Sequence, residues 1–253
     1  MLVYRCEDSL EGVFSAIYQA YEDRQKPEDV YMSLTEEAFL FADDRESTPD
    51  LQKAVKVMRT LRQRFGEEDY DRICLALAAN DTEKAQAVYW AIAMGLRNRA
   101  VPGHLLDGQA DGQVRRVFEL ARKVNREKEH LIEFLRFEEL KNGILYAKVG
   151  PRHQVLAFLM PHFAERFPRE NFMIYDDVRG VFGVHPSGEQ WYLLKGEEIL
   201  KQVNDIGPTD REKEYQELFK HFCHKISIEE RENRQLQRNL LPLRFREYMV
   251  EFQ

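Results

Sequence analysis

Cysteine is scarce in this chain: of its 253 residues, three are cysteines, Cys6, Cys74 and Cys223. An odd, scattered set does not form a disulfide framework, and it indicates free thiols in a reducing compartment. Three cysteines this far apart in sequence are also a poor source of ligands for an iron–sulfur cluster. The cysteine pattern therefore predicts a cytoplasmic protein.

Long apolar runs are also missing, so the sequence predicts no transmembrane helix. The opening segment, MLVYRCEDS, has neither a basic start nor a long apolar stretch, which disfavours a secretory signal. The net charge is −7. This acidic balance disfavours a protein that coats nucleic acid through its overall charge, but it leaves room for a local basic patch.

Several signature motifs are absent. The chain has no Walker loop, no G-x-G-x-x-G, no G-x-S-x-G elbow and no paired C-x-x-C. His221 and His224 are spaced like metal ligands, and Glu127 precedes His130 as in a di-iron motif, but neither pair has the further ligands that such sites require. We therefore expect no metal site and no cofactor.

The clearest structural pattern runs from residue 134 to residue 194. FLRFEEL and ILYAKV flank Asn142-Gly143, a favoured pair for a tight hairpin turn. A helix is predicted between Pro151 and Phe167, followed by FMIYDD as the first strand of a three-stranded meander. The sequence thus predicts an α+β protein, with a mostly helical part over 1–110 and an antiparallel sheet flanked by helices over 111–253.

The first part begins with a predicted strand, LVYRCE, and a helix that Asp8 opens. Residues 23–47 are predicted to be irregular, and another helix is predicted to begin at Thr48-Pro49 and to end at Gly66. The apolar faces of these two helices are predicted to consist of Leu10, Val13, Phe14, Ile17 and Tyr21, and of Leu51, Val55, Met58, Leu61 and Phe65.

A row of arginines near the C-terminus is the most suggestive functional pattern. Arg231, Arg234 and Arg238 share one face of a predicted helix, with Asn233 beside them. Guanidinium and amide groups in a row are suited to contacts with phosphates and bases. Two alternatives remain open: a solvated face with pairs such as Glu230–Arg234, or pairing with acids of the sheet region.

The helix before this row is predicted to be buried on one side. Its apolar residues are Tyr215, Leu218, Phe219, Phe222 and Ile226.

A second group consists of His162, Arg166, Asp176 and Arg179. A histidine and a carboxylate beside arginines could perform acid–base catalysis or hold a phosphate. The structural alternative is that Asp176 caps a turn and that Arg166 or Arg179 pairs with it. The sequence alone favours this alternative.

FLRFEEL, YAKVGP, HFAERF, IYDDVRG and YQELFKHFCHKISIEERENRQLQRNLLPLRF follow one another in an order that is specific. In these stretches the chain resembles an uncharacterised bacterial family whose members are described as probable DNA metabolism proteins. The resemblance covers nearly the whole chain, and Phe245-Arg246 stands where that family usually has a Tyr-Trp pair. The motif residues that match are Arg136, His162, Arg166, Asp176, Arg179, Arg231, Asn233 and Arg234.

The resemblance implies a partnership with a radical-SAM protein of DNA repair or DNA modification. Related domains are fused to uracil-DNA-glycosylase-like enzymes, but the family has no established activity to transfer. The leading hypothesis is thus an accessory protein of DNA repair or modification that binds DNA, the radical-SAM partner, or both. The residues expected to contact nucleic acid are Arg136, Arg166, Arg231, Asn233, Arg234, Arg238 and Arg244.

The alternative is an enzyme that processes nucleic acid or nucleotides. His162 or Asp176 would then be the acid or base, and arginines such as Arg179 would hold a phosphate. A third possibility is a protein-interaction module that does not contact DNA.

Overall fold

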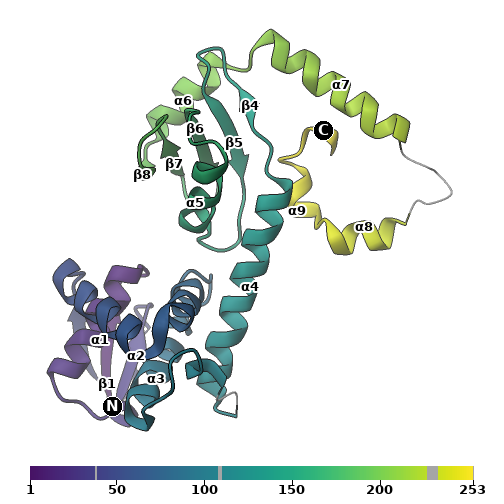
Figure 1. Cartoon of the computed structure of the whole chain (residues 1–253). Helices are drawn as coiled ribbons and strands as arrows, with labels where there is room; N and C mark the ends of the chain where they lie inside the picture. Colours follow the sequence, from purple (N-terminus) through teal and green to yellow (C-terminus); the bar gives the residue numbers. More distant parts are fainter. Residues whose placement is uncertain (38, 108–109, 227–232, 253) are drawn as a thin grey trace. The chain divides into compact units, whose positions relative to one another are not determined.

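The computed structural model describes residues 1–37, 39–107, 110–226 and 233–252 of the chain (Figure 1). The chain divides into two compact units, Met1–Arg126 and Glu127–Gln253. Helix α4, Gly112–Phe134, contributes residues to both units, and the boundary expected at residue 110 falls just in front of it. Helices and strands occur together, which confirms the predicted α+β class.

The first unit contains a parallel sheet in the order β2-β1-β3. Its strands are β1 (Leu2–Cys6), β2 (Val30–Ser33) and β3 (Asp43–Ser47). The prediction of an irregular segment over 23–47 was wrong, since both β2 and β3 lie in it. Strand β3 has the sequence DDRES and buries only Ser47, so it has no apolar pattern to reveal it.

Three helices accompany this sheet: α1 (Leu10–Glu22), α2 (Leu51–Leu77) and α3 (Lys84–Asn98). The cap residues of α1 and α2 are Ser9 and Asp50, rather than the predicted Asp8 and Thr48. Ser9 accepts a hydrogen bond from the amide of Gly12, and Asp50 accepts from two amides of the first turn of α2. Both caps satisfy amides that have no partner inside the helix.

The inward face of α2 differs from the predicted one. Ala54, Val57, Leu61 and Phe65 are buried, whereas Leu51 and Val55 are exposed. Tyr21 on α1 is also exposed, and it was predicted to be buried. The small Ala54 occupies an inward position in the first turn of α2, whereas the larger Leu51 and Val55, which were predicted to be buried, face outward.

Gly66 interrupts α2, as its position predicted. Its φ of 84° and ψ of 171° lie outside the helical region, so α2 consists of two helical segments. A positive φ is easily adopted by glycine and strained for residues with a Cβ.

A lysine is fully buried in the first unit. The ammonium group of Lys84 donates a hydrogen bond of 2.7 Å to the carbonyl oxygen of Ala79. It also forms an ion pair with the carboxylate of Asp8. These partners offset part of the desolvation cost of the buried charge.

The second unit contains a sheet in the order β4-β5-β6-β7-β8. Its strands are β4 (Glu138–Glu139), β5 (Leu145–Val149), β6 (Phe172–Asp176), β7 (Val181–His185) and β8 (Tyr192–Lys195). The hairpin around Asn142-Gly143 and the antiparallel meander β6-β7-β8 confirm the prediction. The prediction of a fully antiparallel sheet was wrong for one pair of strands, because β5 and β6 are parallel.

The parallel pair follows from helix α5 (Leu156–Arg166), which returns the chain from the end of β5 to the beginning of β6. One face of the sheet packs with α6 (Glu197–Ile206) around Tyr146, Tyr175 and Phe182. Alternation along β7 turns Gly183 to the other face, where a Cβ atom would lie 2.3 Å from the sulfur of Met160. The glycine therefore lets α5 approach the sheet closely.

The chain continues with helices α7 (Asp210–Ile226), α8 (Arg234–Leu240) and α9 (Leu243–Arg246) and the short helix η4 (Val250–Phe252). Among the helices of the described residues, none has the length and apolar character needed to cross a membrane. The three cysteines are free thiols, as predicted.

Candidate functional site

The polar residues of the second unit gather where β5 and β6 end. Val149 and Asp176, the last residues of these two parallel strands, are paired in register. The loop 150–155 follows one strand, and the turn 177–180 follows the other. The carboxyl ends of neighbouring parallel strands are the usual location of binding sites in α/β structures, which makes this edge the first place to examine.

Asp176 and Arg179 form the centre of this edge. The buried carboxylate of Asp176 accepts hydrogen bonds from the amides of Val178 and Arg179 at 3.0 and 3.1 Å. It also accepts one from the guanidinium of Arg179 at 3.1 Å. Burial raises the pKa of Asp176, and the adjacent guanidinium opposes that shift.

Arg179 also holds the neighbouring loop. Its guanidinium donates to the carbonyl oxygens of Pro151 at 3.0 Å and Arg152 at 2.7 Å. One side chain thus ties the turn after β6 to the loop after β5. The geometry is that of a structural clamp.

Glu127 holds the same loop from helix α4. Its carboxylate is buried and accepts hydrogen bonds from the amides of Arg152 at 3.0 Å and His153 at 2.8 Å. It also forms an ion pair of 2.8 Å with the guanidinium of Arg244. The loop 151–153 therefore receives donors from Arg179 on its carbonyl side and an acceptor from Glu127 on its amide side.

His153 is buried inside this network. Burial lowers the pKa of its imidazole, and the nearby carboxylate of Glu127 partly opposes this shift. Gly150 precedes it in the loop, and a Cβ atom there would lie 2.3 Å from the hydroxyl oxygen of Tyr248. The loop 150–155 is therefore restrained both by hydrogen bonds and by close packing against Tyr248.

The carboxylates of this network are occupied by donors, so they are poorly placed to accept a proton from a substrate. The outward side of the edge carries the exposed Arg152, the half-exposed side chain of Arg244 and Asp177, whose carboxylate is paired with Lys148 at 3.0 Å. The arrangement can position cations for an anionic partner. Within the described residues, no cluster of histidine, cysteine and carboxylate side chains is arranged to hold a metal ion.

His162 and Arg166 do not join this network. The ring of His162 lies edge-on to Phe163 at 5.1 Å, and the guanidinium of Arg166 lies over the ring of Phe167 at 5.6 Å. Helix α5 runs opposite to β5 and β6, so its C-terminal part lies toward the start of β6, whereas Asp176 ends that strand. The structure brings Asp176 and Arg179 together and leaves the other two apart.

The predicted nucleic-acid-binding residues are dispersed. Arg136 donates to two backbone carbonyl oxygens and lies 3.4 Å from the carboxylate of Glu251. Asn233 caps α8 by accepting a hydrogen bond of 2.9 Å from the amide of Leu236. Arg234 is the first residue of that helix, Arg238 is exposed on it, and Arg231 lies outside the described residues.

The apolar face of α7 is exposed, which corrects the prediction that it is buried. Leu218 is 64% exposed, Phe222 is 55% and Ile226 is 58%. Tyr215 and Phe219 line a cavity of about 380 Å³ next to η4, and they remain partly exposed as well. The sequence period identified the apolar face, but nothing in the period says whether another part of the chain covers it.

Sequence reasoning missed Glu127, Arg152 and His153 as members of the network. A signal for Glu127 was present: it follows Val124 by three positions and precedes Leu131 by four, on the inward face of α4. An acid in an apolar stripe indicates a buried partner. The loop residues carry no comparable signal, because backbone amides bind Glu127.

Comparison with curated proteins gives no match for this chain. A family model described as a domain of unknown function, DUF4130, matches residues 82–251. The matched region includes Glu127, the loop 150–155, the Asp176–Arg179 pair and helices α7 to α9. Because the match covers most of the sequence, the chain belongs to this family of unknown function.

Proposed function

We propose that this protein is an accessory factor of DNA repair or DNA modification, which binds a radical-SAM partner enzyme, DNA, or both. The observation that carries the proposal is the exposed apolar face of α7, on which Leu218, Phe222 and Ile226 are each more than half exposed in the described part of the chain. The DNA context and the choice of partner rest on the family resemblance of the sequence.

The exposure of several large apolar side chains on one helix supports a protein partner. Soluble monomers rarely expose large contiguous apolar patches, and such patches mark interaction surfaces. The following helices α8 and α9 also carry exposed apolar side chains, since Leu236, Leu240 and Leu243 are each more than half exposed. An amphipathic helix of this sort binds by laying its apolar side into a groove of the partner.

Cations on the same helices support an anionic contact beside the apolar one. Lys225 lies in the last turn of α7, and Arg238 is exposed on α8. Separation of His162 from Asp176, and the use of Asp176 in a structural clamp, favour an accessory role over catalysis at these residues.

Docking is tested by titrating the radical-SAM partner with the full chain in isothermal calorimetry. Phe222→Asp should weaken binding at least about tenfold, because a charge would enter an apolar contact. Lys213→Asp, on the opposite side of α7, is the matched control and should change affinity little. Since Phe222 is 55% exposed, both variants should keep their thermal stability.

The DNA arm uses fluorescence anisotropy with labelled single- and double-stranded DNA over a salt series. Replacing Arg231, Arg234 and Arg238 together by alanine should lower the slope of log affinity against log salt by roughly two to three. Absence of both partner and DNA binding at micromolar concentrations would refute the proposal. A dimer that Phe222→Asp dissolves would instead assign the face to a second copy of the chain.

A further inference from the structure

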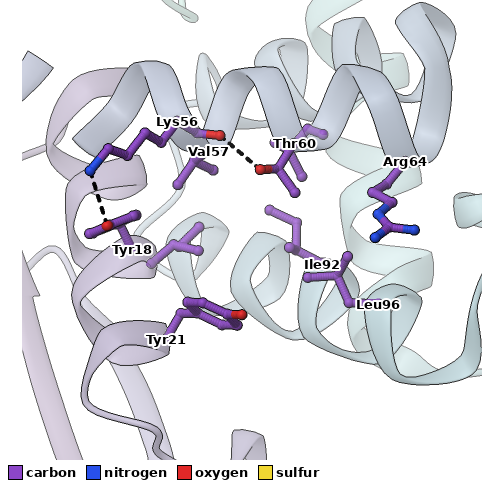
Figure 2. A pocket seen from close by; sticks show the side chains of 10 residues that line it. Tyr18, Tyr21, Lys56, Val57, Thr60, Arg64, Ile92 and Leu96 are labelled. Carbon is purple, nitrogen blue, oxygen red and sulfur yellow. Dashed lines mark hydrogen bonds between the residues drawn. The ribbon is translucent and has the colours of Figure 1, made fainter. Parts of the chain in front are cut away.

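The first unit contains a cleft that the proposal above does not use. It lies between α1, α2 and α3 and has a volume of about 330 Å³ (Figure 2). The residues that line it are Ile17, Tyr18, Tyr21, Lys56, Val57, Thr60, Leu61, Arg64, Ile92 and Leu96. This volume lies in the range of sites for small ligands.

The cleft has an apolar floor and a polar, aromatic rim. Ile17, Val57 and Ile92 are buried and belong to the floor. The ring of Tyr21 stands at the rim and is 76% exposed, so one of its faces is accessible. Lys56 and Arg64 stand at opposite ends of the cleft, as Figure 2 shows.

The charge of the cleft comes from one helical segment. Residues 51–65 of α2 contain five lysines and arginines and no aspartate or glutamate, in a chain whose net charge is −7. Lys53 lies 3.8 Å from the carboxylate of Glu22, and Arg62 lies 3.3 Å from that of Glu67. These two cations are therefore partly neutralised.

The two cations of the cleft are not neutralised in this way. Lys56 donates a hydrogen bond of 3.2 Å to the hydroxyl of Tyr18 and lies 4.9 Å from the centre of its ring. In the described part of the chain, neither Lys56 nor Arg64 forms an ion pair with a carboxylate, and no acid lines the cleft. The cleft thus complements a negatively charged ligand.

A second cavity adjoins the cleft and extends its positive charge. It has a volume of about 620 Å³ and shares Arg64 and Leu96 with the cleft. Arg99 and Gln63 also line it. Arg64 therefore stands between an apolar space with tyrosines and a polar space with a second guanidinium.

We propose that these adjoining cavities bind a nucleotide, with its base against Tyr21 and the apolar floor and its phosphate on Arg64 and Arg99. Arginine forks suit phosphate oxygens, and exposed aromatic rings stack with any base. An acidic peptide would satisfy the cations but would leave the tyrosine face without a planar partner. A free nucleotide and a nucleotide unit of single-stranded DNA share the required chemistry.

The proposal is tested with the full chain by fluorescence anisotropy of labelled single-stranded oligo-dT. Unlabelled thymidine monophosphate, duplex DNA and an oligo-glutamate peptide serve as competitors. Tyr21→Ala should weaken binding about 5- to 150-fold, as expected for one stacked base. Arg64→Ala should lower the salt slope by about one, and Arg59→Ala, an exposed cation of α2 that does not line the cleft, is the matched control.

Competition by the monophosphate that depends on Tyr21 identifies the free nucleotide as a ligand, and Tyr21-dependent binding of the strand alone identifies single-stranded DNA. Three results would overturn the proposal. The first is stronger competition by duplex DNA or by the peptide than by the monophosphate, and the second is the absence of any binding. The third is an equal loss of affinity in Arg59→Ala and Arg64→Ala with no loss in Tyr21→Ala. The Arg231, Arg234 and Arg238 triple variant separates this site from the C-terminal helices, because it should leave the Tyr21 effect intact.

Discussion

Replacing Glu127 by alanine should destabilise the second unit strongly. The substitution removes the acceptor of two amide hydrogen bonds, from Arg152 and His153, and the partner of Arg244. A hydrogen bond to a charged group contributes about 1.5–3 kcal/mol. The side chain of Arg244 is 41% exposed, so its released charge can be solvated and its share is at most about 1 kcal/mol.

The two amide bonds dominate the expected loss, which we place at about 3–5 kcal/mol in the free energy of unfolding. This is a large fraction of the stability of a typical domain, about 5–15 kcal/mol. Glu127→Gln should lose less, since an amide oxygen keeps one acceptor. Arg244→Ala should lose about 1 kcal/mol or less, because the amide bonds to Glu127 remain.

Urea unfolding followed by tryptophan fluorescence can measure this loss in the second unit. The two tryptophans lie in different units, Trp90 in the first and Trp191 in the second. A Trp90→Phe background therefore leaves Trp191 as a reporter of the second unit. If Glu127→Ala costs less than about 1 kcal/mol, the two amide bonds do not hold the loop, and the reasoning is refuted.

Three further predictions concern other buried groups. Burial lowers the pKa of His153, so the unfolded chain takes up a proton first as the pH falls; urea midpoints should therefore decrease below about pH 6.5, and His153→Asn should flatten this dependence. Gly150→Ala should cost about 1–3 kcal/mol in urea unfolding because a Cβ would press on Tyr248, and little of that extra cost should remain in a Tyr248→Ala chain. Lys84→Ala should cost about 2–5 kcal/mol in urea unfolding of the first unit, because it leaves a cavity and removes the donor to the carbonyl oxygen of Ala79, whereas the half-exposed Asp8 can be solvated. Lys84→Met should cost less because it fills the same space without a buried charge.

Local sequence signals identified the elements whose structure depends on residues close by in the sequence. The turn at Asn142-Gly143, the meander from β6 to β8 and the stop at Gly66 all follow from short-range backbone preferences. Strand β3 could not be found in this way, because its acidic sequence forms a strand only through pairing with β1. The parallel pairing of β5 and β6 likewise depends on where α5 places the chain.

The candidate site shows the same division. The pairing of Asp176 with Arg179 follows from a separation of three residues, and sequence reasoning included it as the structural alternative. Glu127 binds amides of a loop that lies 25 residues further along the chain, and no pattern encodes that contact. The exposure of the apolar face of α7 was also not predictable, since an apolar stripe predicts burial but does not identify the segment that would cover it.

The interruption of α2 at Gly66 has an electrostatic consequence. Each helical segment carries partial positive charge at its beginning and partial negative charge at its end. Because the helix breaks at Gly66, Arg62 and Arg64 belong to the last turn of one segment, and Glu67 and Glu68 to the first turn of the next. Each of the four side chains then carries a charge opposite in sign to the partial charge of the adjacent helix terminus, which is a favourable interaction. In a continuous helix the same residues would lie in the middle, where the helix dipole does not stabilise charged side chains. The break at Gly66 therefore allows a basic stretch to be followed directly by an acidic stretch, with both stabilised by the helix termini.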